Sequence, residues 1–266
     1  MTETAAQIGI IGGSGFYEIN GFEIIDEIKV DTPFGSPSDS YKVLKIAQKQ
    51  VLFLNRHGSG HSIAPHKVNY RANIWGLKKL GAKRIFATGA VGAINKDFKT
   101  GEFVLIDQII DMTHSRASTF YEQDKTIHID LTEPYCPHLR KVLKEAADEL
   151  LIKHIHEKGT YICTQGPRFE TKAEIHLFAS IGADVVGMTA MPEAALAREL
   201  ALCYATLCIV TNEAAGINKE KINALEVLEI LNKSKETLNK LFAQSVRLLA
   251  EERRCRCKDA LEDSEI

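Results

Sequence analysis

Apolar residues along the chain follow two alternating patterns. Short runs rich in β-branched residues, as expected of buried strands, are followed by segments in which apolar residues recur at helical spacing. The predicted strands are residues 7–11, 22–30, 41–46, 51–54, 84–88, 103–110, 160–164, 184–186 and 207–210. The predicted helices are residues 68–80, 139–151, 172–180, 192–200 and 223–252. This alternation is typical of the α/β class and predicts an α/β/α sandwich around a central, mostly parallel (mixed) sheet.

The chain is predicted to fold as a single domain. Its 266 residues suit one large α/β domain, and no repeat, linker or low-complexity tract divides them. We assign the domain to residues 1–254 and expect a loose C-terminal tail over residues 255–266. The net charge of −2 gives no basic field for nucleic acid or an anionic membrane. No apolar run has membrane-spanning length and no signal-peptide pattern is present, so we expect a cytoplasmic protein.

Neither the cysteines nor the histidines predict a metal site. Three cysteines lie in or beside apolar runs, one follows a loop proline, and two form a C-x-C in the charged tail: Cys163, Cys203, Cys208, Cys136, Cys255 and Cys257. No spacing typical of four zinc ligands is present, and no carboxylate or cysteine cluster completes a site with the histidines near residue 60. We therefore expect no metal and no cofactor. The tail pair could form a disulfide, an adventitious metal site or nothing.

Loops of small residues follow several predicted strands, near residues 12–15, 89–92, 165–167 and 214–216. In a parallel sheet they would gather at one edge, where α/β proteins bind ligands. The first loop fails the strict dinucleotide pattern, because Glu18 stands where the third glycine belongs. Its amides and Ser14 could still bind a small oxyanion, or the loop could be a plain tight turn.

Two further segments are candidates for anion binding. Arg56 and His57 stand just beyond a predicted strand, where arginine offers a planar fork of donors suited to phosphate. The histidine would add a donor when protonated. The alternative is a solvated surface pair. Thr189 precedes a predicted helix, whose N-terminus favours anions.

Other side chains suit a heterocycle and a sugar. Phe169, in a turn, could stack on a flat ring, and Met188 could lie against the same ring or belong to the core. Glu170 could accept N–H groups of a base, or simply place charge at a helix start. Glu193 could clasp a ribose diol or play the same helix-start role.

Seven segments in order resemble the trimeric purine nucleoside phosphorylases and the related 5′-methylthioadenosine and 5′-methylthioinosine phosphorylases. They are IGIIGGSGF, TPFGSPSD, RHG, HKVNYRANIW, TQGPRFET followed by AE, GADVVGMTAMPE and TNEAAG. The resemblance covers residues 8 to 216 and implies phosphorolysis, in which inorganic phosphate, a co-substrate, displaces the purine from the sugar. It implies no cofactor, and it implies a homotrimer.

The resemblance also assigns residues to the substrates. It implies a phosphate site formed by the side chains of Ser14, Arg56, His57 and Thr189 and by the backbone of Ala90. Members often carry a hydroxyl where this chain has Gly89, which puts one phosphate contact in doubt. The purine and ribose would meet Phe169 and Met188, and Asn212 would bind N7 and the 6-substituent. His128 would reach across a subunit interface toward the 5′ end of the sugar.

The base-facing residues predict which purine is used. A 6-oxopurine presents O6 and N7 as acceptors, and the NH₂ of Asn212 can donate to both. Glu170 can accept N1–H. The adenine-type enzymes have D-x-D where this chain has Asn212 and Ala214, and serine in place of Glu170. We therefore expect 6-oxopurine nucleosides such as inosine, guanosine or 5′-methylthioinosine, with Asn212 and His57 as catalytic residues.

Three alternatives remain open from the sequence. One is a 5′-methylthioadenosine phosphorylase with relaxed base choice. A nucleoside hydrolase would use water and would need no anion clamp. A non-catalytic nucleotide-binding domain is disfavoured by the failed glycine motif.

Overall fold

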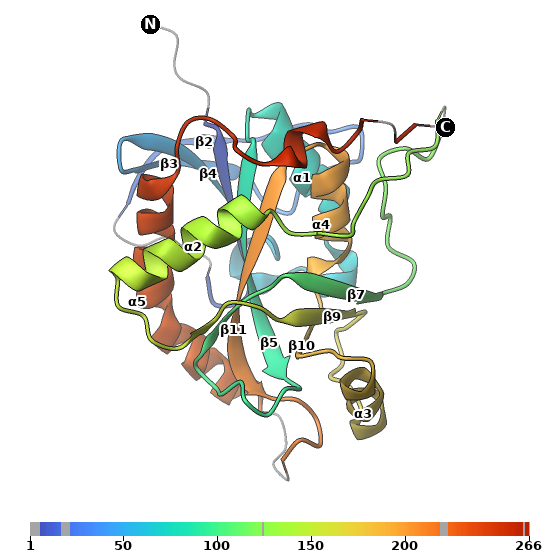
Figure 1. Ribbon diagram of the computed structural model, residues 1–266. Coiled ribbons are helices and arrows are strands. Elements are labelled where there is room, and N and C mark those ends of the chain that lie inside the picture. The colour runs from blue at the N-terminus through green and yellow to red at the C-terminus, as the bar shows by residue number, and fades with distance from the viewer. Residues whose placement is uncertain (1–5, 17–21, 124, 219–222, 263, 266) are drawn as a thin grey trace, which may run out of the picture.

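The computed structural model describes residues 6–16, 22–123, 125–218, 223–262 and 264–265 (Figure 1). The strands are β1 (Ile8–Gly12), β2 (Glu23–Ile28), β3 (Tyr41–Ile46), β4 (Lys49–Asn55), β5 (Arg84–Ala93), β6 (Phe103–Leu105), β7 (Gln108–Met112), β8 (Ile155–His156), β9 (Thr160–Thr164), β10 (Val185–Gly187) and β11 (Cys203–Glu213). The α-helices are α1 (Tyr70–Lys79), α2 (Pro137–Glu149), α3 (Lys172–Ser180), α4 (Ala190–Glu199) and α5 (Ala224–Leu248). Three 3₁₀ turns are η1 (Ser59–His61), η2 (Pro65–Lys67) and η3 (Arg256–Asp259).

The strands form one mixed sheet centred on β5. The order along its main path is β2-β3-β4-β1-β5-β10-β9-β7, and β11 pairs with the other edge of β5 and with β6. The pairs β1–β4, β1–β5, β5–β11 and β9–β10 are parallel. The pairs β5–β10 and β6–β11 are antiparallel. Because β1, β4, β5 and β11 run in the same direction, their carboxyl ends meet at one edge of the sheet.

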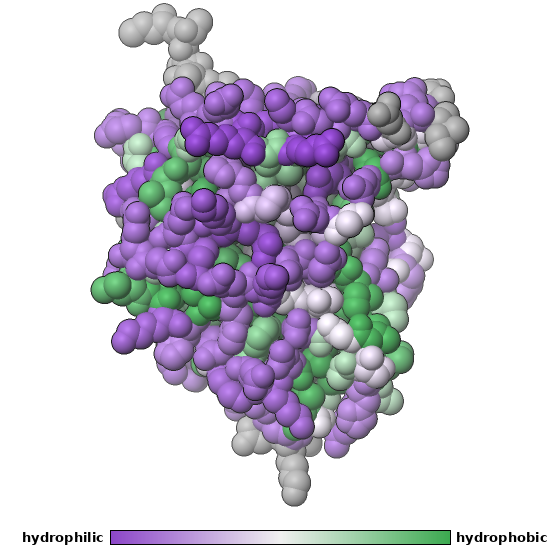
Figure 2. Space-filling model, viewed as in Figure 1, coloured by the Kyte–Doolittle hydropathy of each residue, from purple (hydrophilic) through white to green (hydrophobic). Residues whose placement is uncertain are grey.

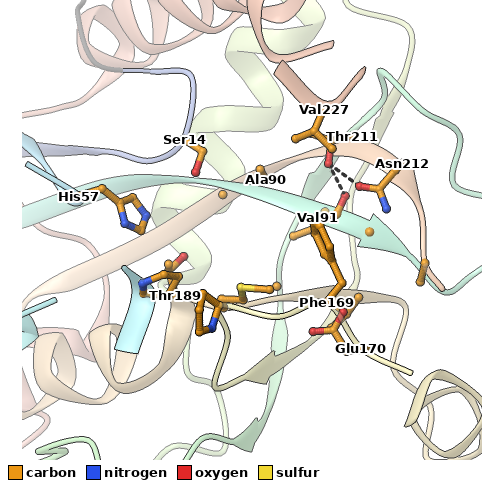
Figure 3. Close-up of a pocket in the computed structure, with 18 of the residues that line it drawn as sticks. Ser14, His57, Ala90, Val91, Phe169, Glu170, Thr189, Thr211, Asn212 and Val227 are labelled. Carbon is orange, nitrogen blue, oxygen red and sulfur yellow. Dashed lines mark hydrogen bonds between the residues drawn. The ribbon is translucent and has the colours of Figure 1, made fainter. Parts of the chain in front are cut away.

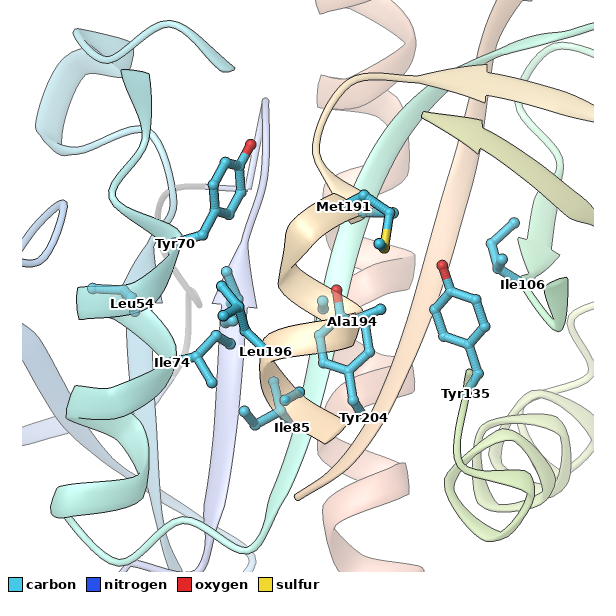
Figure 4. Packing of buried hydrophobic residues seen from close by; sticks show 14 of the residues in the cluster. Leu54, Tyr70, Ile74, Ile85, Ile106, Tyr135, Met191, Ala194, Leu196 and Tyr204 are labelled. Carbon is cyan, nitrogen blue, oxygen red and sulfur yellow. The ribbon is translucent and has the colours of Figure 1, made fainter. Parts of the chain in front are cut away.

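Helices cover both faces of the sheet (Figure 1). Residues of α1 and α4 belong to one buried cluster, in which Ile74 and Leu196 meet Ile85 of β5 (Figure 4). Residues of α2 and α5 belong to a second cluster on the opposite face, represented by Leu139 and Phe242. The predicted α/β/α sandwich in a single domain is therefore confirmed.

The structure extends two central strands beyond their predicted ends. Residues 89–92 were expected to form a loop, but β5 continues to Ala93, because Gly92 and Ala93 pair with β10 on one edge and with β11 on the other. β11 likewise continues through Asn212, with a bulge between Val210 and Asn212. The predicted strand 103–110 instead divides into β6 and β7, which pair with different strands.

The C-terminal segment differs from the loose tail that the sequence predicted. Cys257 is buried within η3. Arg253 donates to the main-chain oxygen of Ala201 at 2.7 Å, and the main-chain N–H of His128 donates to Ser264 at 2.8 Å. The segment therefore packs against the amino-terminal end of β11. Over the described parts of the chain, no helix is both long enough and apolar enough to cross a membrane.

Candidate active site

A cavity of about 250 Å³ opens at the carboxyl ends of β1, β4 and β11 (Figure 3). Ten residues predicted from the sequence line it: Ser14, Arg56, His57, Ala90, Phe169, Glu170, Met188, Thr189, Asn212 and Ala214. Ser14, His57 and Thr189 lie at one end, and Phe169, Glu170 and Asn212 lie at the other (Figure 3). The loops after β1 and β11 thus meet at one sheet edge, as their positions after parallel strands predicted. Residues 89–92, which belong to β5, and the loop after β9, which runs antiparallel to β5, also reach the cavity.

Arg56 is held by a fully buried carboxylate. The side chain follows β4 and is 1% exposed, and Glu193 is 0% exposed. The Nε and Nη2 atoms of Arg56 donate to the two oxygens of Glu193, both at 2.7 Å, and Nη1 donates to the main-chain oxygen of Thr88 at 2.8 Å. Burial opposes the guanidinium charge, but Glu193 outweighs it and raises the pKa of Arg56. Arg56 is therefore a fixed cation, with further N–H groups for a ligand in the cavity.

Glu193 lies in the first turn of α4, which is the helix-start position considered from the sequence, and it has a further role that the sequence did not indicate. Besides Arg56 it accepts the hydroxyl of Tyr204 at 2.7 Å. Its oxygens are occupied by protein partners, so it does not meet a ribose diol. A buried ion pair of this kind is costly to desolvate and is held by accurate geometry, which here fixes where the guanidinium lies.

His57 is a buried, uncharged imidazole. Its Nδ1 lies 2.8 Å from the main-chain oxygen of Ile63. Because a carbonyl only accepts, Nδ1 carries the proton and Nε2 of the neutral ring is an acceptor. Burial, together with the charge on Arg56 and the nearby His61, lowers the pKa of His57 to about 4. The donor expected from the sequence would require the protonated ring, which is not the form at neutral pH.

The loop after β1 approaches Arg56 closely. The N–H of Gly13 donates to Thr88 Oγ1 at 2.7 Å. A Cβ at Gly13 would lie 2.8 Å from the main-chain oxygen of Thr88 and 2.9 Å from Nη1 of Arg56. Glycine is therefore required at this position, and the neighbouring Ser14 is brought to the cavity wall beside Arg56.

Two further positions of the anion end differ in detail from expectation. Thr189 caps no helix with its side chain, and the backbone leaves helical geometry at Met191 (φ −115°, ψ 138°). The regular part of α4 thus begins after Met191, so Thr189 lines the cavity from an irregular turn rather than from a regular helix terminus. At Gly89, a Cβ would lie 3.0 Å from the sulfur of Cys208. A larger residue with a hydroxyl at this position would therefore press against the side chain of Cys208.

At the other end of the cavity, Phe169 and Glu170 lie between β9 and α3. Phe169 is 46% exposed, which is unusual for a side chain with only a packing role. Glu170 accepts the hydroxyl of Thr164 at 2.7 Å. The start of α3 is capped by Thr171 and Glu174 in a reciprocal capping box. The helix-start role considered for Glu170 therefore belongs to Glu174, and Glu170 faces the cavity.

The amide of Asn212 has a defined orientation. Its Oδ1 accepts the hydroxyl of Thr211 at 2.9 Å (Figure 3). Its Nδ2 donates to the main-chain oxygen of Glu213 at 2.8 Å. A flip would place Oδ1 against a carbonyl oxygen, where neither can donate. One N–H of Asn212 is thus committed, and the other remains for a ligand, rather than the two that the sequence argument assumed.

Arg116 is a residue that the sequence analysis missed. It donates to the main-chain oxygens of Thr164 and Gln165 at the end of β9 and to those of Met188 and Met191 before α4. These bonds join the two loops that carry the base-facing residues. An arginine in a Ser/Thr-rich loop gave no periodic signal by which it could have been found.

Two expectations concern groups outside the cavity. His128 is exposed and does not line the cavity of its own chain, so its assignment to a neighbouring subunit's substrate stays a prediction.

Against the expectation of no metal, the structure brings together Cys136, Cys203, Cys255 and Cys257 at the amino-terminal end of β11. Among the described residues, this is the sole group of three or more potential metal ligands, and it lies away from the cavity.

Comparison with known proteins decides the family. A family model described as the phosphorylase superfamily matches residues 7–247. The chain belongs to this superfamily. The family predicted from the sequence motifs is therefore confirmed.

Relatives within the superfamily align over nearly the whole chain. A 6-oxopurine nucleoside phosphorylase from Pyrococcus furiosus is 51% identical over 262 residues, or 96% of this chain and 97% of that protein. A probable S-methyl-5′-thioinosine phosphorylase from Thermodesulfovibrio yellowstonii is 49% identical over 259 residues, or 97% of each. Methylthioadenosine phosphorylase from Schistosoma mansoni, solved with adenine, superposes with a TM-score of 0.92 at 35% identity over 97% of this chain and 96% of that one.

Proposed function

We propose that the protein catalyses the phosphorolysis of purine nucleosides and prefers 6-oxopurine bases, with inosine, guanosine or 5′-methylthioinosine as substrates. The observation that carries the proposal is the buried Arg56–Glu193 pair, which presents a fixed cation at one end of a cavity whose other end carries Phe169, Glu170 and Asn212. Purine nucleoside phosphorylases are pentosyltransferases, and the relatives named above support this class.

At the anion end, Arg56 with Ser14, Thr189 and the backbone of Ala90 binds inorganic phosphate. Nε2 of neutral His57 accepts the O–H of monohydrogen phosphate, since that nitrogen carries a lone pair. A phosphate oxygen then attacks the anomeric carbon of the nucleoside. The new C–O bond forms as the C–N bond to the purine breaks, and the bonding electron pair leaves with the base. Positioning and charge stabilisation supply the catalysis, without a cofactor.

At the base end, the leaving purine gathers negative charge. The one free N–H of Asn212 lies between N7 and O6 and is shared by the two acceptors, and Glu170 accepts N1–H. Phe169 and Met188 hold the flat ring and the sugar. Adenine offers N6–H₂ to an amide N–H and a bare N1 to a carboxylate, so both polar contacts are mismatched. Because Thr211 and Glu213 fix the amide, a flip to accommodate adenine is costly.

The working form is a homotrimer in the cytoplasm. Figure 2 supports an assembly, since apolar surface lies over β7, β9 and α3 at the right-hand edge of the view. Met112, Phe169, Leu177 and Ile181 are exposed apolar side chains of this region. Contiguous apolar surface next to a site is typical of an interface. A partner on this face would also bring an exposed loop such as that of His128 to a neighbouring cavity.

A second candidate function is 5′-methylthioadenosine phosphorylase, favoured by the fold similarity to the Schistosoma enzyme solved with adenine. One assay separates these functions. Inosine, 5′-methylthioinosine and 5′-methylthioadenosine are incubated with and without phosphate, and free base and sugar phosphate are measured. We expect base release only with phosphate, and faster from the two 6-oxopurine nucleosides. Equal release without phosphate would instead support a hydrolase.

A further inference from the structure

Four of the six cysteines converge at the end of the sheet that lies away from the cavity. Cys203 begins β11, Cys136 is the residue before α2, and Cys255 and Cys257 come from the C-terminal segment. Their four sulfur atoms all lie within 4.8 Å of one another. Three of these residues are buried and Cys255 is partly exposed. Segments far apart in sequence thus direct four thiols into one small volume.

The arrangement of the sulfurs suits a tetrahedral ion. With Zn–S bonds of about 2.3 Å, sulfur atoms of a tetrathiolate site lie roughly 3.8 Å apart. Cys203 and Cys255 are 3.3 Å apart, well beyond the disulfide bond length of about 2.05 Å, and all six cysteines are free. Two disulfides would require only two close pairs of sulfurs, whereas here all four sulfurs lie around one centre, as the ligands of a single ion do.

A buried cation lies beside the thiols, because Arg84 of β5 pairs with Cys203 of β11. Four thiolates around a divalent ion carry a net negative charge, and the buried Arg84 lies beside them. Its Nη2 donates to the main-chain oxygens of Ala250 and Glu251. Its buried Nε has no hydrogen-bond partner among the described residues.

We propose that Cys136, Cys203, Cys255 and Cys257 bind one structural zinc ion that fastens the C-terminal segment to the sheet. Zinc fits a closed four-thiolate set, and no redox role is needed at this position. Asn212 lies toward the opposite end of β11, roughly 30 Å away at about 3.3 Å per residue. The ion therefore acts on folding and not on the reaction. Sequence spacing missed the site because its ligands come from three separate segments.

The test begins with the metal content of the full-length, tag-free protein, prepared with reductant and without added chelator. Mass spectrometry should find about one zinc per chain, and a mercurial reagent should release it into a colorimetric zinc indicator. Cys255→Ser and Cys257→Ser should each lower the zinc content, whereas Cys208→Ala, a buried cysteine outside the cluster, should not. Removal of zinc from the wild type should lower the melting temperature, and added zinc should restore it.

Two further readouts keep the proposal falsifiable if a cysteine variant fails to fold. Cobalt(II) added to the zinc-free wild type should give the intense visible absorption of a tetrahedral thiolate site. Thiols are also counted in denaturant without reductant after chelation, where all six cysteines should react. No zinc with Cys163 and Cys208 alone reacting would overturn the proposal in favour of two disulfides. No metal with six reactive thiols, or a different metal in the isolated protein, would also overturn it.

Discussion

The two ends of the cavity are held in different ways. At the phosphate end, Arg56 and Glu193 are buried, bonded to each other twice, and braced by Thr88 and Tyr204. At the purine end, Phe169 is half-exposed and Glu170 accepts a hydrogen bond from the hydroxyl of Thr164. At the first end, protein partners fix the position of the cation. At the second end, Phe169 and Glu170 have few protein contacts and can adapt to the base.

This difference corresponds to the two substrates. Phosphate is the same anion in every turnover, so a rigid cation can be prepared for it at a fixed position. The base varies among nucleosides, and discrimination requires donors and acceptors that are satisfied by one base and left unpaired by another. Stability should therefore depend on the phosphate end, and base choice on the purine end.

The largest expected effect comes from the same substitution made at both ends. Glu193→Gln leaves the buried Arg56 without its counter-charge and should reduce the free energy of unfolding by about 3–5 kcal/mol. Glu170→Gln, at the partly exposed end, should cost less than about 1 kcal/mol. Urea denaturation of both variants checks this. Equal losses would remove the proposed distinction between the ends.

Arg56→Ala should lower kcat/KM, because one preorganised anion donor is lost. The expected loss of transition-state stabilisation is about 2–4 kcal/mol. The preference between 6-oxopurine and 6-aminopurine nucleosides should stay unchanged, since the purine end is intact. Steady-state kinetics at varied phosphate measures both quantities. A changed base preference with normal use of phosphate would contradict the assignment.

Stability should also depend on pH through His57. Its pKa is about 4 in the folded protein, lowered by burial and by Arg56, against about 6.5 when unfolded. The unfolded chain therefore binds the proton first, and the free energy of unfolding should fall as pH decreases from 6.5 to 4. The full loss, reached below pH 4, should be about 3 kcal/mol. His57→Asn keeps a donor for Ile63 and should flatten this part of the profile. The same slope in the variant would show that other groups cause it.

Asn212→Asp should give a smaller change, confined to base choice. A carboxyl oxygen in place of the free amide N–H can accept N6–H₂, so one mismatch with adenine disappears. The ratio of kcat/KM for 6-oxopurine over 6-aminopurine nucleosides should fall by about 1–3 kcal/mol. The dependence on phosphate concentration should be retained. An unchanged ratio would mean that Asn212 does not face the 6-position.

Local sequence patterns predicted the fold class because strands and helices of this type have distinct apolar spacing. They failed where pairing partners decide the structure. Residues 89–92 are small and resemble a loop, yet strands on both edges hold them in β5. The charged C-terminal segment resembled a loose tail, but Cys257 is buried against the sheet.

The candidate site was predicted residue by residue, mainly from ordered motifs that end strands. Its internal bonding was not. Glu193 lies far from Arg56 in sequence, and no pattern indicates that it occupies two of the arginine's nitrogens. Arg116 was missed for the same reason, since its partners are main-chain oxygens from two distant loops.

The measurement that tests the account most directly is kcat/KM of the wild-type protein for 5′-methylthioinosine and for 5′-methylthioadenosine, at the same saturating phosphate concentration. These substrates share the sugar and differ only in the purine. With the amide of Asn212 fixed and Glu170 facing N1, two mismatches with adenine predict a preference for the 6-oxopurine of at least about 30-fold. A preference for 5′-methylthioadenosine would contradict the roles given to Asn212 and Glu170.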